Sequence, residues 1–283
     1  MKILNKIFSI TNDGYHKLIT VFGIKMRFLK YSRTDVLLMQ QNEALNIMSK
    51  KLENVMKILL LPDNIFSFNK TNVFVPNFPI DFIQRHIVIN NQYFEEDVLK
   101  DLDNYIPEGA TILDCGANIG NHTMYWLLSS PKNIKKIHAF EPVKSTFDIL
   151  NKNVEINNIK DKVVLHNFGL HDKNTNGCIT HYEVENIGGT NIREGNGCIE
   201  LKRLDDISIQ EESIDFMKID VEGSEVNLLN GGVDLINKFK PTIFIESFPE
   251  HYEQVKTFMK NNGYKLIKEY EGYNYLYKFD EKK

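Results

Sequence analysis

Two acidic residues flank a glycine-containing turn in the middle of the chain. Asp114 lies in a short apolar run, residues 111–115, and the loop 116–120 follows with the sequence Gly-Ala-Asn-Ile-Gly. Glu141 comes directly after the next apolar run and stands 21 residues beyond the last glycine of the loop. Small residues in such a turn allow a ligand to approach the backbone. A strand-tip acid at about this spacing receives the hydroxyls of a ribose, so the pattern predicts a nucleoside-containing ligand.

The first position of the loop distinguishes between nucleoside ligands. The dinucleotide fingerprint places three glycines around a pyrophosphate, whereas here the spacing is Asp114-x-Gly116-x-Asn118-x-Gly120. A carboxylate at the start of the loop repels a pyrophosphate and suits a ligand that carries an ammonium and a sulfonium. We therefore expect S-adenosylmethionine, with its methionine end on this loop and its ribose on Glu141. A Rossmann oxidoreductase that uses NAD is the alternative.

Further acids follow two later apolar runs. Asp220 ends the run 215–220, Glu222 lies in the turn after it, and Glu246 follows the run that starts at residue 242. Such acids can orient a polar acceptor, and one of them can remove its proton as a general base. His122 is a fourth candidate for this role. The alternatives are helix N-capping for Glu222 and a local hydrogen bond for His122. No metal site is assigned, although the three acids would also suit a divalent cation.

Apolar runs alternate with helical patterns over most of the chain. This alternation predicts an α/β fold with a largely parallel sheet and helices on both faces. The last two runs are joined only by Glu271-Gly272 and should form a hairpin, which leaves one antiparallel strand. Strands are expected at 111–115, 136–140, 163–168, 215–220, 242–247, 264–268 and 273–278, and helices at 95–106, 120–129, 144–157, 223–237 and 250–262.

The remaining segments define the domain organisation. Residues 1–34 form a basic segment, whose part 20–28 alternates like a hairpin around Gly23. They suit either a membrane surface or partner, or a solvated hairpin packed on the domain. Residues 35–61 predict one long helix whose leucines repeat every seven positions. It suits either a coiled-coil homodimer or an amphipathic helix on its own domain. Residues 62–283 form the main domain, with β-rich runs over 72–91 and a β excursion over 175–204.

Composition limits the classes of function. The chain has 283 residues, 42% of them hydrophobic, and a formal net charge of −4, which argues against general nucleic-acid binding. Its three cysteines cannot all pair in disulfides and form no CxxC motif, which fits a reducing cytoplasm. No apolar run approaches the roughly 18 residues of a transmembrane helix, and the first residues do not read as a signal peptide.

Several motifs together resemble the FkbM family of S-adenosylmethionine-dependent methyltransferases. The resemblance implies a seven-stranded, Rossmann-like class I methyltransferase fold and methyl transfer to oxygen, often to a hydroxyl of a sugar or a glycosylated natural product. Cys115 stands where the family often has valine. The matching stretches are 113–123, 139–142, 188–190, 204–206, 218–225 and Lys240-Pro241 before Glu246.

The first 60 residues lie outside this resemblance. Residues 6–10 and 16–26 are similar to a leader found on bacterial surface-polysaccharide enzymes. We therefore expect a cytoplasmic O-methyltransferase that acts on a sugar hydroxyl or on a capsule or lipopolysaccharide precursor. Asn167 and Gly169, within 167–170, should flank the adenine, and 188–191 should close over the acceptor. A non-catalytic scaffold with a methyltransferase fold is a further alternative, against which the intact acids argue.

Overall fold

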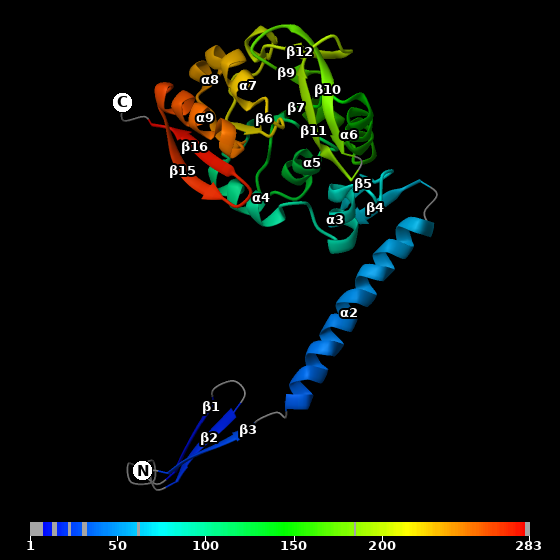
Figure 1. Ribbon diagram of the computed structural model, residues 1–283, viewed down its shortest axis with the longest axis vertical. Coiled ribbons are helices and arrows are strands. Elements are labelled where there is room, and N and C mark those ends of the chain that lie inside the picture. The colour runs from blue at the N-terminus through cyan, green and yellow to red at the C-terminus, as the bar shows by residue number, and fades with distance from the viewer. Residues whose placement is uncertain are drawn as a thin grey trace. The chain divides into compact units, whose positions relative to one another are not determined.

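The computed structural model describes residues 8–12, 16–21, 24–29, 33–60, 63–183 and 185–280 (Figure 1). The chain divides into two compact units, Met1–Val55 and Met56–Lys283. Among the described residues, none of the helices is both long enough and apolar enough to cross a membrane.

The first unit holds a small sheet and most of a long helix. Strands β1 (Phe8–Asn12), β2 (His16–Val21) and β3 (Ile24–Leu29) form an antiparallel sheet. Val21 pairs with Ile24, so the predicted hairpin is confirmed, although Gly23 itself lies outside the described residues. Helix α2 covers Arg33–Leu60. Residues 1–7, at the start of the basic segment, also lie outside the described residues, as does Pro62, a proline that by its type predicts the end of the helix.

The second unit is built on a seven-stranded sheet in the order β15-β16-β14-β13-β6-β7-β8. Strand β16 is antiparallel to both of its neighbours, and the other pairings are parallel. The predicted fold class, a mostly parallel seven-stranded sheet that ends in a hairpin, is therefore confirmed. The strands are β6 (Thr111–Cys115), β7 (Lys136–Phe140), β8 (Val163–His166), β13 (Phe216–Ile219), β14 (Thr242–Glu246), β15 (Tyr264–Tyr270) and β16 (Asn274–Phe279).

Apolar side chains bury both faces of this sheet. Neighbouring strand residues point to opposite faces, and Ile112 and Leu113 of β6 accordingly belong to different core clusters. Trp126 and Phe216 share the first cluster with Ile112, while Met217 shares the second with Leu113. Burial on both faces explains why these strands read as continuous apolar runs instead of alternating ones.

Helices connect the parallel strands. One prediction was wrong here, since a single helix was expected over 223–237 and two are present. The glycine pair at 231–232 separates them, and a side chain at Gly231 would lie 1.9 Å from the carbonyl oxygen of His171. The helices are α4 (Glu96–Leu102), α5 (Asn121–Leu128), α6 (Lys144–Ile156), α7 (Glu225–Gly231), α8 (Val233–Phe239) and α9 (Pro249–Asn261).

The β-rich prediction for residues 72–91 was wrong over its second half. A hairpin of β4 (Ile65–Phe68) and β5 (Thr71–Phe74) is followed by helix α3 (Phe82–Asn90). Asp81 starts the helix because its carboxylate accepts a hydrogen bond from the backbone N–H of Gln84. This N-cap and a buried stripe that includes Ile87 outweigh the β-branched composition of the segment.

The excursion over 175–204 forms a separate sheet. Strands β10 (Thr175–Glu183) and β11 (Asn186–Glu194) pair as a long hairpin, visible in yellow-green in Figure 1. Strands β12 (Ile199–Lys202) and β9 (Gly169–Leu170) complete the order β11-β10-β12-β9. Because β9 follows β8 of the main sheet, this second sheet lies at the edge where the parallel strands end.

Candidate active site

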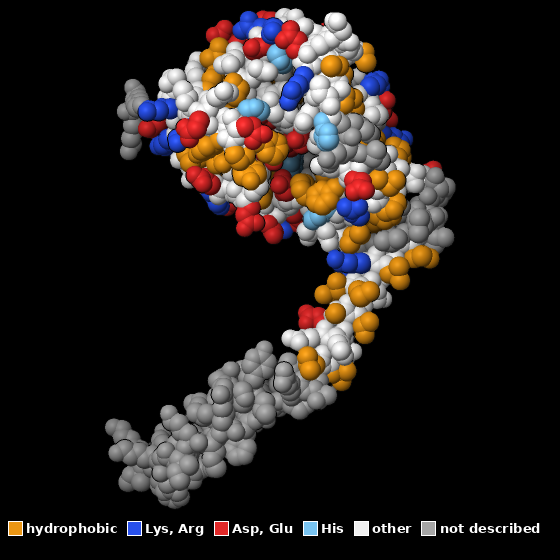
Figure 2. Space-filling view, in the orientation of Figure 1, with side chains coloured by type: hydrophobic (Ala, Val, Ile, Leu, Met, Phe, Trp, Pro, Cys, Tyr) orange, Lys and Arg blue, Asp and Glu red, His pale blue; other side chains and the backbone are white. Residues whose placement is uncertain are grey.

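The carboxyl ends of the central strands surround a cavity of about 230 Å³. Ligands of open α/β sheets bind in the crevice outside these strand ends. In the space-filling view, acidic side chains lie beside a hollow in this face of the domain (Figure 2).

Most of the residues predicted from the sequence line this cavity. Those that line it are Gly116, Asn118, His122, Glu141, Gly169, Asp220, Glu222 and Glu246. Three predicted ligand-binding residues are not among the lining residues: Asp114, Gly120 and Asn167. The structure thus brings together all four candidates for proton transfer and four of the seven for ligand binding.

The two glycines of the loop are required by the protein's own packing and backbone conformation. Gly116 has a φ of +82°, and a Cβ atom there would lie 1.7 Å from the carbonyl oxygen of Asp220. Gly120 has a φ of +88°, and its Cβ would lie 2.6 Å from the Cδ1 atom of Leu150. Both backbone conformations favour glycine. The loop is therefore shaped by close contact with β13 and α6, and not by ligand approach alone, as the sequence had suggested.

Asp114 is fully buried beneath the loop. One of its carboxylate oxygens accepts a hydrogen bond of 2.6 Å from the Thr123 hydroxyl. The other lies 3.6 Å from the Nζ atom of Lys218, which itself is 3.0 Å from the Asp220 carboxylate. Lys218 also donates a 2.7 Å hydrogen bond to the carbonyl oxygen of Gly116. Asp114 thus positions the loop, α5 and Lys218 from behind the cavity.

Lys218 keeps its charge although it is buried. Burial alone would lower its pKa, but the carboxylates of Asp220 and Asp114 outweigh burial and raise it. Asp220 responds in the opposite sense. Burial would raise the pKa of its carboxyl, but the Lys218 ammonium and a hydrogen bond with Glu246 lower it. Lys218 therefore favours an ionised carboxylate on Asp220.

Glu141 lies at the tip of β7 with both carboxylate oxygens engaged. The backbone N–H of Asn118 donates to one oxygen at 3.0 Å, and that of Val143 donates to the other at 2.8 Å. Burial raises the pKa of this carboxyl to about 7, and the two backbone hydrogen bonds oppose that rise. The N–H groups fix the orientation of the carboxylate, whose remaining lone pairs can accept two ligand hydroxyls.

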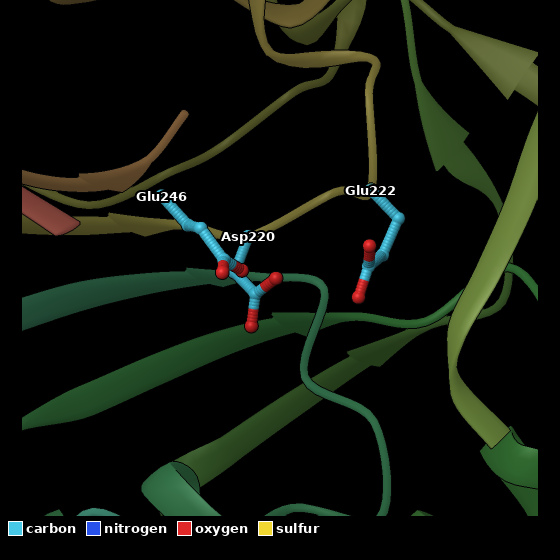
Figure 3. A group of neighbouring side chains, drawn as sticks. All are labelled: Asp220, Glu222 and Glu246. Carbon is cyan, nitrogen blue, oxygen red and sulfur yellow. The ribbon is translucent and has the colours of Figure 1, made fainter. Parts of the chain in front are cut away.

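Three acids come together at the ends of β13 and β14. Figure 3 shows the side chains of Asp220 and Glu246 directed toward one another, with Glu222 in the turn beside them. Each offers a carboxylate oxygen within 4.8 Å of the others. Burial and the neighbouring Asp220 raise the pKa of Glu246 to about 9. The Asp220–Glu246 pair thus holds one proton near neutral pH. Hard oxygen ligands at this spacing would also suit a divalent cation.

His122, at the start of α5, lies beside a glutamate in the same cavity. Its Nε2 atom lies 3.5 Å from the Glu95 carboxylate, and its ring lies 5.8 Å from that of Trp126. Glu95, at the start of α4, has a φ of +57° and lines the same cavity. Both the local and the catalytic interpretation of this histidine stay open.

The hairpin β10–β11 forms one wall of the site. The Asn191 side chain donates a 3.1 Å hydrogen bond to the carbonyl oxygen of Glu222. The N–H of Ile187 donates to the Asp81 carboxylate at 3.2 Å, and the N–H of Phe82 donates to the carbonyl oxygen of Glu185 at 2.7 Å. Gly188 and Thr190 line the cavity. The wall is thus fastened to both the acidic turn and α3.

Aromatic rings border the side of the cavity beyond β7 and β8. The ring of Phe140 stacks on His166 at 4.3 Å and meets Phe168 edge-on at 5.8 Å. Asn167 turns its side chain away from the ligand space and donates a 2.9 Å hydrogen bond to the carbonyl oxygen of Glu141. It therefore fastens the ribose-side acid, while Phe168 and Gly169 face the cavity.

Some residues that line the cavity were not predicted from the sequence. Glu95, Phe82 and Phe94 come from segments that precede the first sheet strand, and Asn274 comes from the antiparallel β16. No local motif marks them, because only the tertiary arrangement brings these segments over the strand ends. Lys218 does carry a signal in the sequence, since a lysine in an apolar strand requires a partner, and its partners are the carboxylates of Asp114 and Asp220.

Comparison with known proteins identifies the family. Residues 114–266, more than half of the chain, match the methyltransferase FkbM domain. The chain belongs to this family. It is thus a member of a methyltransferase family, and the recognition from its motifs is confirmed. The matched region contains every site residue predicted from the sequence.

Individual relatives share a limited part of their length with the chain. It is 27% identical over 177 residues to "Methyltransferase 1" of Beauveria bassiana, covering 54% of this chain and 67% of that protein. It is 28% identical over 163 residues to "Methyltransferase sdnD" of Sordaria araneosa, covering 44% of this chain and 61% of that protein. A crystal structure of methyltransferase FkbM from Methylobacillus flagellatus is similar at a TM-score of 0.47 and 15% identity, covering 70% of this chain and 52% of that one.

Proposed function

We propose that this protein transfers the methyl group of S-adenosylmethionine to a hydroxyl of a sugar in a surface-polysaccharide precursor, in the cytoplasm. One observation carries the proposal. A buried strand-tip acid, Glu141, and two neighbouring carboxyls, Asp220 and Glu246, line the same cavity. The first group suits a ribose and the second suits removal of a hydroxyl proton.

The residues around the cavity suit this methyl donor. Glu141 would accept hydrogen bonds from the ribose hydroxyls, the loop 116–118 would face the methionine end, and Phe168 with Gly169 would flank the adenine. Five acids and one lysine, Lys218, are the charged side chains among the described residues of the lining, which favours a ligand with an ammonium and a sulfonium. The donor supplies an electrophilic methyl group, so the protein needs mainly to align the acceptor and take its proton.

Asp220 is the base that the geometry favours. Lys218 and Glu246 keep its carboxylate ionised near neutral pH, whereas the raised pKa of Glu246 keeps that carboxyl protonated. As the hydroxyl oxygen bonds to the methyl carbon, its proton passes to Asp220, and the electrons of the broken carbon–sulfur bond stay on sulfur. Asp220→Asn should therefore reduce kcat by about 100-fold or more, while the variant should still bind S-adenosylhomocysteine.

A neutral acceptor suits the charge of the site better than a phosphate. The acids Asp220, Glu222 and Glu246 meet where the acceptor hydroxyl must lie, and such a cluster repels phosphate groups. This favours a sugar over a nucleic acid and agrees with the resemblance of the N-terminal segment to polysaccharide enzymes.

The test compares acceptors in one assay. The protein is incubated with methyl-labelled S-adenosylmethionine and, in turn, with nucleotide sugars, capsular and lipopolysaccharide oligosaccharides, tRNA and rRNA. We expect an O-methyl group on a sugar hydroxyl, absent from the Asp220→Asn variant. Methylation of RNA or of a nitrogen atom would contradict the proposal. Stabilisation against heat by NAD but not by S-adenosylhomocysteine would favour an oxidoreductase instead.

We also infer that α2 pairs with α2 of a second copy. Seven large apolar side chains of the helix are 48–68% exposed: Leu37, Leu38, Leu45, Ile47, Met48, Leu52 and Met56. Leu38, Leu45 and Leu52 recur every seven residues, as in the seam of a coiled coil. Ile47 lies on the opposite face, and the other six side chains share one stripe. Covering this stripe would bury on the order of 600 Å² per helix, close to the roughly 800 Å² that each partner contributes to a stable interface.

Charge favours a second copy over a lipid surface. Helix α2 carries Arg33, Lys50, Lys51 and Lys57 against Asp35, Glu43 and Glu53, so it is nearly neutral. A helix that lies on anionic lipid usually has a basic polar face. Multi-angle light scattering should give a dimer for the wild type and for the outward-facing control Asn46→Lys, and a monomer for Leu45→Lys/Leu52→Lys. A monomeric wild type, or one that binds phosphatidylserine vesicles through this helix, would overturn the pairing.

A further inference from the structure

A second, wider groove adjoins the cavity that we assign to the methyl donor. Its volume is about 970 Å³, at the upper end of the range for small-molecule sites. The two spaces share lining residues at the acidic turn and on β11: Asn186, Ile192, Glu222, Ser224 and Glu246. The groove therefore leads directly to the acids that we propose to receive the acceptor hydroxyl.

Polar side chains form most of the groove. Its lining combines hydrogen-bond donors and acceptors from β10 and β11, from the segment after β9 and from the two helices α7 and α9: His171, Asp172, Lys173, His181, Asn191, Arg193, Glu194, Asn227, Glu250 and His251. Such a surface suits a ligand with many hydroxyls spread along its length, because each hydroxyl both donates and accepts hydrogen bonds.

One aromatic side chain lines the groove at the start of α9. Phe248 belongs to the lining, and its ring centre lies 6.1 Å from that of Tyr273, a side chain that is 50% exposed. Tyr252 of α9 stacks on Tyr275 of β16 at 4.5 Å. An exposed aromatic face next to polar groups matches a sugar ring, which presents C–H groups on its faces and hydroxyls around its edge.

The charges of the groove disfavour a phosphorylated ligand. Lys173 is paired with Glu194 at 2.6 Å, which leaves Arg193 as the cation without an acidic partner at the described surface of the groove. Glu222, Glu246 and Glu250 lie along the same lining. A chain of phosphates would meet net negative charge here, whereas a neutral glycan would not.

We propose that this groove binds the acceptor as a non-phosphorylated oligosaccharide of at least two sugar units. The terminal unit presents its hydroxyl to Asp220 and Glu246, and the next unit lies against Arg193, Phe248 and Tyr273. This inference rests on the methyl-transfer function proposed above and adds the size and the charge of the substrate.

The test measures binding with the donor site filled. Full-length protein saturated with S-adenosylhomocysteine is applied to an array of neutral mono- and oligosaccharides and to a fluorescent RNA stem-loop. We expect oligosaccharides to bind more tightly than their monosaccharides, and Arg193→Ala and Tyr273→Ala each to weaken that binding by about tenfold. The exposed control on α6, Lys152→Ala, should bind like the wild type, and all variants should keep wild-type affinity for S-adenosylhomocysteine.

Failures of the two proposals are distinguishable. No affinity of the wild type for S-adenosylhomocysteine would overturn the methyl-transfer function. Three results would overturn only the proposal for the groove, provided that the affinity for S-adenosylhomocysteine is retained. They are binding of the RNA, absence of any bound glycan on the array, and glycan binding that is unchanged in both Arg193→Ala and Tyr273→Ala.

Discussion

Replacement of Glu141 by glutamine should weaken donor binding in a pH-dependent way. The carboxylate accepts N–H groups from Asn118 and Val143 and has lone pairs left for the two ribose hydroxyls. An amide at this position turns an NH₂ group toward one of these donors and removes the charge from the remaining hydrogen bonds. Hydrogen bonds to a charged group contribute about 1.5–3 kcal/mol, so the affinity for S-adenosylhomocysteine should fall roughly 10- to 100-fold.

The raised pKa of Glu141 predicts how the wild type responds to pH. The ribose hydroxyls donate hydrogen bonds to the ionised carboxylate, and the pKa of Glu141 in the free protein is about 7. The affinity for S-adenosylhomocysteine should be highest above that pH and should fall by about tenfold for each pH unit below it. The fall should stop at the pKa that Glu141 has in the complex. Glu141→Gln should show no such slope, because the amide does not titrate.

Isothermal titration calorimetry with S-adenosylhomocysteine between about pH 5.5 and 8.5 measures both effects. The matched control is Glu212→Gln, an exposed glutamate that does not line the cavity. It should reproduce the wild-type curve. Wild-type affinity that is constant across the pH range, or equal affinities of Glu141→Gln and the wild type at pH 8, would show that the ionised Glu141 carboxylate does not bind the ribose.

Three further predictions concern the frame around the site. Lys218→Met should lower the free energy of unfolding in urea by about 3–5 kcal/mol, because it leaves the carboxylates of Asp114 and Asp220 without their cation; Lys152→Met should leave it unchanged. Gly116→Ala should cost more than about 2 kcal/mol in the same assay, since its Cβ would overlap the carbonyl oxygen of Asp220; a cost below that value would argue against the close approach. Removal of divalent cations with EDTA should leave methyl transfer unchanged, because the Lys218 ammonium and the shared proton already compensate the acids; restoration of lost activity by Mg²⁺ would contradict this.

The sequence predicted the main sheet well because each parallel strand is buried on both faces and stands out as an apolar run. The strand-tip acids could be predicted for the same reason, since Glu141, Asp220 and Glu246 each lie where such a run ends. Helix α3 was missed because its β-branched composition concealed the N-cap of Asp81. The break at the glycine pair 231–232 was missed because the residue that approaches Gly231, His171, lies far away in the sequence.

The roles of individual site residues were harder to predict than their presence. Asp114 was expected to meet the ligand, yet its buried carboxylate contacts Thr123 and Lys218 behind the loop. A carboxylate at a strand end reads the same in the sequence whether its neighbour is a ligand or a lysine of the next strand. Glu95 was not predicted as a site residue, since its place beside His122 depends on how the fold brings the residue before α4 to the cavity.

Identifying the methylated atom is the strongest test of methyl transfer to a sugar hydroxyl. The protein should be incubated with methyl-labelled S-adenosylmethionine and a panel of neutral oligosaccharides, and the product should be analysed by mass spectrometry and NMR. We expect a new O-methyl group on one sugar hydroxyl, formed by the wild type and absent with Asp220→Asn. A methyl group on RNA, protein or a ring nitrogen, or equal transfer by Asp220→Asn, would contradict it.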